Sequence, residues 1–303
     1  MRTQLVSLHT LLAFCLALNS SCRSTIYRKR IWRRQIKLAV QPECGRLSSS
    51  DFANFNSGSD LTQIQTIYSF GDSWTSNGKF DGSPAIPAVA QGNNPMYGRR
   101  ASNGPMWTEH LTSSQQVLKN YAVGGATVDH NLWKARANKS DMVGQVDKFL
   151  SQGQSINSAS LATIFYGIND YAALQEGPGS LEEAAKELLK QTERLISVGL
   201  THFIVLTPYF NRPDINNFNK LIWNGFKSLN QSRGIKFAYV DLSALFTAIY
   251  ANPSSFGYKS TGACLKSALT TQGGCNDPDD YLYWIPSHPQ YQTHRLIADW
   301  VSA

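Results

Sequence analysis

Five short apolar runs, separated by stretches of helical periodicity, constrain the fold of this chain more than any other feature. The runs are short and mostly apolar, which is typical of strands that are buried on both faces of a sheet. The runs are Ile64–Phe70, Val117–Val123, Leu161–Tyr166, His202–Thr207 and Ile235–Val240. Buried strands that alternate with helices predict a three-layer α/β/α domain around a central, mostly parallel five-stranded sheet.

The clearest helical pattern covers Leu181–Val198, whose apolar residues fall on one face. Ser180 and Glu183 form a capping box at its start, and Gly199 stands where a C-terminal cap belongs. Further helices are expected at Met106–Thr112, Met142–Ser151, Ile215–Ser232 and Gln290–Val301.

The N-terminal region differs in composition from the remainder of the chain. Leu5 to Leu18 form an apolar stretch after Arg2, too short for an ordinary membrane span, so we expect a secretory signal peptide over residues 1–22. Residues 23–60 are first basic and then polar, and they could be a propeptide or a disordered segment. A retained signal anchor, an organellar transit peptide and a wrongly assigned first exon are the alternatives. The folded domain is expected to cover residues 61–303 and to be extracellular and monomeric, without stable membrane insertion.

The net charge of +7 gives no reason to expect a nucleic-acid partner. Residues 1–42 hold eight basic and no acidic residues, which leaves 20 basic and 21 acidic residues in the body of the protein. We also expect no cofactor and no metal, because the sequence has no P-loop, no dinucleotide-binding glycine motif after a strand and no His-x-x-x-His.

Cysteines and glycosylation acceptors favour an oxidising compartment. Cys264 and Cys275 flank a short loop, which predicts a local disulfide; two free thiols are the alternative. The sequence does not indicate with which cysteine Cys44 pairs. Asn138 and Asn230 each begin an Asn-x-Ser acceptor pattern, which is consistent with a secreted glycoprotein.

Four motifs lie where ligands bind in open parallel sheets, at strand ends or before the last helix. Ser73 ends a Gly-Asp-Ser turn after the first strand, and its hydroxyl could be a nucleophile if a base such as His288 is near. The glycine pair Gly124-Gly125 follows the second strand, and Asn169 follows the third. Backbone N–H groups and an Asn amide can stabilise an oxyanion. Taken singly, each motif could equally be a turn, a cap or a surface residue.

Together, the four blocks have the order and spacing of the GDSL, or SGNH, hydrolase superfamily, which the chain resembles from about Ile64 to Ala303. No Gly-x-Ser-x-Gly elbow occurs, which argues against the ordinary α/β-hydrolases. Tyr-Leu-Tyr-Trp before His288-Pro289 and Thr-His-Arg-Leu-Ile-Ala after it are similar to fungal acetylesterases of carbohydrate esterase family sixteen.

The resemblance implies a flavodoxin-like sheet and a role for each motif. Ser73 would be the nucleophile and His288 the general base. Gly125, rather than Gly124, would donate its N–H to an oxyanion hole together with the Ser73 N–H and the Asn169 amide. Asp72 would brace the turn.

One position departs from the superfamily pattern, which usually has an aspartate three residues before the catalytic histidine. This chain has Ile285 there. Three arrangements compete: a backbone carbonyl near Ile285 or Pro286 holds the imidazole, an acidic residue of the segment 277–280 (Asp277, Asp279 or Asp280) folds back to do so, or catalysis has been lost.

Three functions follow from these alternatives. The first is a serine esterase, an acetylesterase that acts on acetylated carbohydrate. The second is a lipase or phospholipase of the same superfamily, and the third is a non-catalytic carbohydrate- or lipid-binding protein.

Overall fold

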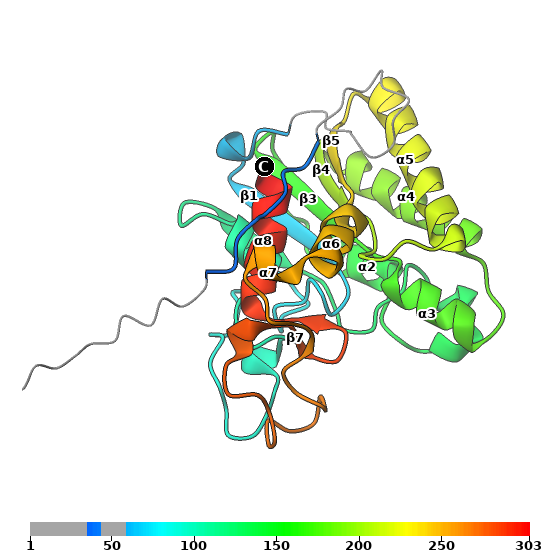
Figure 1. Ribbon diagram of the computed structural model, residues 1–303. Coiled ribbons are helices and arrows are strands. Elements are labelled where there is room, and N and C mark those ends of the chain that lie inside the picture. Colours follow the sequence, from blue (N-terminus) through cyan, green and yellow to red (C-terminus); the bar gives the residue numbers. More distant parts are fainter. Residues whose placement is uncertain (1–34, 44–58) are drawn as a thin grey trace, which may run out of the picture. The chain divides into compact units, whose positions relative to one another are not determined.

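A five-stranded sheet forms the centre of the protein (Figure 1). The structure is a computed structural model and describes residues 35–43 and 59–303. Neighbouring strands of the sheet, in the order β2-β1-β3-β4-β5, are all parallel, which confirms the expected sheet. The strands are β1 (Thr66–Gly71), β2 (Val117–Asn120), β3 (Ser160–Phe165), β4 (His202–Leu206) and β5 (Lys236–Val240).

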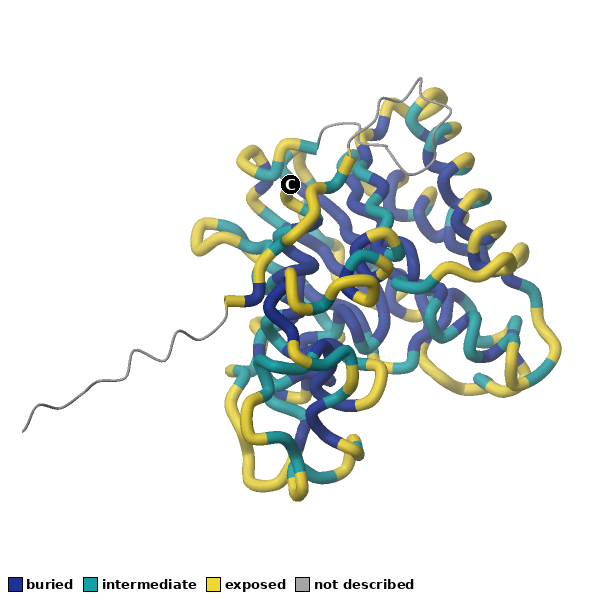
Figure 2. Tube along the Cα trace, in the orientation of Figure 1, coloured by how far each residue is buried: buried dark blue, intermediate teal, exposed yellow. Residues whose placement is uncertain are grey.

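Alternate residues of each strand face two separate apolar clusters. In β3, Ala162 and Ile164 belong to one cluster, and Leu161 and Phe165 belong to the other. The first cluster is covered by α2 (Met142–Ser151), α4 (Leu181–Ser197) and α5 (Pro213–Arg233). The second is covered by α1 (Trp107–Leu111), α6 (Leu242–Ala251), α7 (Pro253–Phe256) and α8 (Tyr291–Ser302). Figure 2 shows the buried strands between these two layers, so the three-layer α/β/α architecture is confirmed.

The five expected helices agree with the sequence patterns to within a few residues, and α3 (Ile168–Glu176), α6 and α7 were not expected. The hydroxyl of Ser180 accepts a hydrogen bond from the Glu183 N–H at 3.2 Å, as the capping pattern predicts. The unexpected α3 begins directly after β3 and its turn. Asn169 therefore lies in the first turn of a helix, where we had expected a strand terminus.

A second, smaller sheet was not expected. It consists of β6 (Ser260–Ala263), β7 (Tyr281–Ile285) and β8 (His288–Pro289). Beside it, Cys264 and Cys275 form the predicted disulfide, with their Cα atoms 5.0 Å apart.

Residues 35–43 contact the domain although they fall in the segment expected to be propeptide or disordered. The side chain of Ile36 is buried in the second cluster, and the Lys37 N–H donates to the Phe256 carbonyl at 3.1 Å. The expected signal peptide and Cys44 lie outside the described residues. Within the described ranges, no helix has the length and apolar character needed to cross a membrane.

Candidate active site

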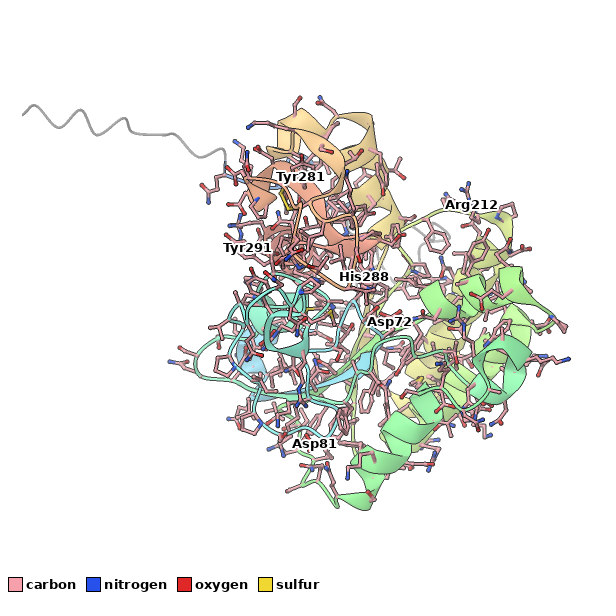
Figure 3. All side chains as sticks on the ribbon, turned by 90° about the horizontal axis from the view of Figure 1, so that it is seen from below. Asp72, Asp81, Arg212, Tyr281, His288 and Tyr291 are labelled. Carbon is pink, nitrogen blue, oxygen red and sulfur yellow. A yellow bond between two sulfur atoms is a disulfide. The ribbon has the colours of Figure 1, made fainter. Side chains whose placement is uncertain are left out.

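Ser73 and His288 meet although 215 positions separate them in the chain. Ser73 lies in the turn after β1, and His288 begins β8 of the small sheet. Ser73 Oγ and His288 Nε2 are 2.9 Å apart. In Figure 3, Asp72, the neighbour of the serine, lies close to His288 near the centre of the view. The geometry is that of a hydroxyl donating to an imidazole.

The opposite ring nitrogen of His288 faces the main chain. Nδ1 is 2.9 Å from the carbonyl oxygen of Pro286. Because a carbonyl can only accept, Nδ1 carries the proton and Nε2 is left as the acceptor for the Ser73 hydroxyl. The structure thus has the first of the three arrangements considered for a chain with Ile285 at the usual aspartate position.

The nearby acidic residues have other partners. Asp280 pairs with Lys259, their closest atoms 2.7 Å apart, and the carboxylate of Asp277 accepts from the Asp279 N–H. Ile285 is buried in a cluster with Trp284 and Cys264. Burial lowers the pKa of His288 below its ordinary value, and the Pro286 carbonyl partly opposes this shift.

The two-residue connection between β7 and β8 sets the position of the Pro286 carbonyl. Pro286 and Ser287 join paired residues Ile285 and His288, and Ser287 has a φ of 61°. Proline followed by a residue of positive φ fits a type II turn. The indole Nε1 of Trp74, the residue after Ser73, donates to the Ser287 carbonyl at 3.1 Å. Trp74 therefore ties the serine turn to the histidine turn.

Asn169 lies beside Asp72 rather than alone at the sheet edge. Its Nδ2 is 3.0 Å from Asp72 Oδ2 and 3.1 Å from the Ala126 carbonyl oxygen. The other Asp72 oxygen accepts from the Trp74 N–H at 2.9 Å, so Asp72 does brace the serine turn. The same carboxyl group holds the amide of Asn169.

The glycine pair also lies at this end of the sheet. Gly125 has a φ of +79°, which L side chains rarely adopt, and a Cβ built there would meet open space. A Cβ built on Gly124 would lie 3.7 Å from Ser73 Cβ. Gly124 is thus next to the serine, and the backbone requirement for glycine is at Gly125.

Two buried carboxyl groups lie next to Asn169, Asp72 by a hydrogen bond and Asp170 along the chain. The sequence indicated Asp72 only as a brace for the turn and did not single out Asp170. Asp72 and Asp170 are both fully buried. Desolvation raises the pKa of Asp72 to about 7 and that of Asp170 to about 6. Asp170 accepts from the Val128 N–H and the Trp133 indole. In the sequence, the signal for this pair is that one acidic residue directly precedes Ser73 and another directly follows Asn169.

One group of side chains in the described residues could offer three ligand atoms to a metal ion. Asp129, His130 and Asp141 place these atoms within 4.8 Å of one another. Both carboxylates already cap helices, Asp141 at Gly144 of α2 and Asp129 at Asn131. His130 pairs with Asp141. Helix capping and this pair account for the arrangement.

Comparison with known proteins gives a family for most of the chain. The family model described as GDSL-like lipase/acylhydrolase matches residues 67–301. This range contains both sheets and all four motifs.

Individual relatives are distant. The chain is 23% identical to a thermolabile hemolysin of Vibrio parahaemolyticus over an alignment of 270 residues that covers 78% of this chain and 63% of the hemolysin. It is 23% identical to a GDSL esterase/lipase of Arabidopsis thaliana, covering 78% of this chain and 86% of the relative. A phosphatidylcholine-sterol acyltransferase of Aeromonas hydrophila is 25% identical, over 65% of this chain and 64% of the relative. The chain thus spans less than two thirds of the hemolysin and of the acyltransferase.

Among solved structures, an α/β hydrolase enzyme from the metagenome of Lake Arreo has a TM-score of 0.44 and 17% identity. The match covers 78% of this chain and 92% of that one.

Proposed function

Because the chain belongs to the GDSL-like lipase/acylhydrolase family, we propose that it hydrolyses carboxylic esters through an acyl-serine intermediate formed on Ser73. His288 is the general base. Gly125 and Asn169, together with the Ser73 N–H, surround the position of the oxyanion. The observation that carries the proposal is the contact of 2.9 Å between His288 Nε2 and Ser73 Oγ.

Each proton has a defined place in this reaction. Ser73 Oγ attacks the ester carbonyl while His288 Nε2 takes the hydroxyl proton, and the carbonyl oxygen becomes an oxyanion. When the C–O bond breaks, His288 returns the proton to the departing alcohol. Water then attacks the acyl-serine, again with His288 as base, and releases the carboxylic acid and Ser73. The Nδ1–H stays directed at the Pro286 carbonyl, which keeps one tautomer throughout.

The Pro286 carbonyl supports catalysis over loss of function. An aspartate fixes the imidazole tautomer and stabilises the imidazolium. The Pro286 carbonyl fixes the tautomer completely, but it stabilises the imidazolium only through its dipole. A degenerate binding protein would have no need to keep the serine, the base and a tautomer-fixing acceptor in contact.

The finer part of the proposal is that the enzyme removes acetyl groups from carbohydrate. It is supported by the motifs on both sides of His288, which resemble those of carbohydrate acetylesterases. A lipase or phospholipase is the second candidate, favoured by the names of the Arabidopsis esterase/lipase and the Aeromonas acyltransferase.

A chain-length series tests both candidates. The wild type should hydrolyse p-nitrophenyl acetate with a kcat/KM well above that for the butyrate and palmitate esters, and it should release acetate from acetylated xylo-oligosaccharides. A preference for palmitate would select the lipase alternative. Ser73→Ala and His288→Ala should each abolish turnover, and the double variant should be little worse, because such residues act as a unit.

We further propose that the protein is secreted. The Cys264–Cys275 disulfide supports this, since such bonds persist in oxidising compartments. Of the two acceptor sites, Asn138 is exposed, whereas the amide nitrogen of Asn230 donates to the Ile235 carbonyl at 2.5 Å. Glycopeptide mapping of secreted protein should therefore find glycan on Asn138 and not on Asn230. An unmodified Asn138 with both cysteines reduced would contradict secretion.

A further inference from the structure

A pocket of about 640 Å³ opens beside α5, at the carboxyl ends of β4 and β5. Its buried floor includes Thr207, Asn219 and Trp223. Exposed Asn216 and Asn224 of α5 stand on its rim. None of the residues that line this pocket belongs to the site described around Ser73.

The pocket is nevertheless close to that site. Thr207 follows β4, which is two strands from β1 in the sheet order. Tyr209, in the loop after Thr207, stacks on Trp74, with ring centroids 4.5 Å apart. Because the carboxyl ends of parallel strands meet at one edge of a sheet, Thr207 and the Ser73 turn lie at the same edge.

One acceptor of the floor has no donor among the described residues. Asn219 is 6% exposed, and its Oδ1 has no hydrogen-bond partner within the described residues. A buried acceptor left unpaired costs free energy, so a ligand hydroxyl that donates to it would be stabilised. The Asp241 carboxylate, which also lines the pocket, accepts from Ser243 at 2.6 Å and is a further acceptor.

The rim has the opposite character. Lys220 and Lys227 are donors only, and the amides of Asn216 and Asn224 can both donate and accept. A ligand must therefore donate to the floor and accept from the rim. Hydroxyl groups do both, and an acyl chain can do neither.

We propose that this pocket binds a neutral, polyhydroxylated sugar unit. The link to catalysis rests on the proposed function: the bound unit is the part of a carbohydrate ester that lies next to the acylated sugar at Ser73. The pocket then positions the alcohol portion of the substrate and has no role in the chemistry of acyl transfer.

Calorimetric titration of the Ser73→Ala protein with unacylated xylotetraose or cellotetraose tests binding without turnover. At least one of the two should bind, and Asn219→Ala in the same background should weaken its binding about tenfold, because the floor acceptor is lost. Asn224→Ala, on the exposed rim, should weaken it severalfold and keeps the test informative if the floor variant fails to fold. Asn217→Ala is the matched control, since Asn217 is exposed on the same helix but does not line the pocket.

Three results would overturn the proposal: neither sugar binding at about 10 mM, equal effects of Asn217→Ala and Asn224→Ala, or inorganic phosphate binding more tightly than the sugars. Failure of the proposed function looks different. In that case the wild type would not hydrolyse acetylated oligosaccharides, while the binding of unacylated sugar would still depend on Asn219. If both proposals hold, Asn224→Ala should raise KM for acetylated oligosaccharides and leave kcat/KM for p-nitrophenyl acetate unchanged.

Discussion

The amide nitrogen of Asn169 has two acceptors near Ser73, Asp72 Oδ2 and the Ala126 carbonyl. These contacts orient the amide, and an oxyanion on the substrate would be a further, charged acceptor. We predict that Asn169→Ala lowers kcat about 10²–10³-fold, as the loss of one oxyanion donor does. Thermal unfolding of the variant separates this from a structural effect. An undiminished kcat with a lowered Tm would place Asn169 outside the oxyanion hole.

Asp72 gives a pH-dependent prediction at the same scale. Burial raises its pKa to about 7 from an ordinary value near 3.8. A carboxyl group whose pKa is raised in the folded state contributes its full stability below its unfolded-state pKa. It loses that stability as the pH rises through its folded-state pKa. The Tm of the wild type relative to Asp72→Asn should therefore be highest near pH 4 and fall towards pH 7. A difference in Tm that is constant with pH would contradict the raised pKa.

At the scale of elements, the β7–β8 turn holds the base. Ser287 has a φ of 61°, which glycine adopts freely and a β-branched residue does not. Ser287→Gly should keep kcat/KM near the wild-type value. Ser287→Val should lower stability by about 1–3 kcal/mol and reduce kcat, because the Pro286 carbonyl moves away from His288 Nδ1. Denaturant unfolding and steady-state kinetics of the two variants check this. Equal kcat for both would mean that the turn does not position the imidazole.

At the scale of the whole molecule, residues 35–43 are part of the folded unit. Ile36 is 2% exposed, and its carbonyl accepts from Arg295 of α8. Full burial of such a side chain is worth about 1.5–3 kcal/mol. A chain that begins at Gln35, directly after Arg33 and Arg34, should keep the full Tm. A chain that begins at residue 44 should unfold several degrees lower. Differential scanning calorimetry distinguishes the two, and equal Tm values would show that this segment is dispensable.

The layers of the fold could be predicted because strands buried on both faces are short and mostly apolar. The helix at Asn169 could not, because Ile168–Glu176 has little apolar periodicity and is fixed by its place after β3. The small sheet was missed for a related reason. β8 has only two residues, and its pairing depends on a turn and a disulfide more than on strand propensity.

The site residues were chosen from their positions at strand ends, and Ser73 and His288 do come together. What holds them could not be read from the sequence. A backbone carbonyl has no residue signature, so Pro286 could be considered only as one of several acceptors. The indole of Trp74 reaches its partner across 213 positions of the chain. Asp72 could be assigned to the turn, but its hold on Asn169 depends on two loops that only the folded sheet brings together.

The central claim is that Ser73 and His288 work as a pair with the Pro286 carbonyl in place of an aspartate. Comparing kcat/KM for p-nitrophenyl acetate between the wild type and Ile285→Asp, across pH 4 to 8, tests it most directly. The wild type should be active, with an acidic limb below the ordinary histidine pKa of about 6.5, since burial lowers the pKa of His288. Ile285→Asp should change activity modestly or lower it, because the carboxylate would be buried among apolar side chains. A nearly inactive wild type whose turnover rises by orders of magnitude in Ile285→Asp would contradict the account.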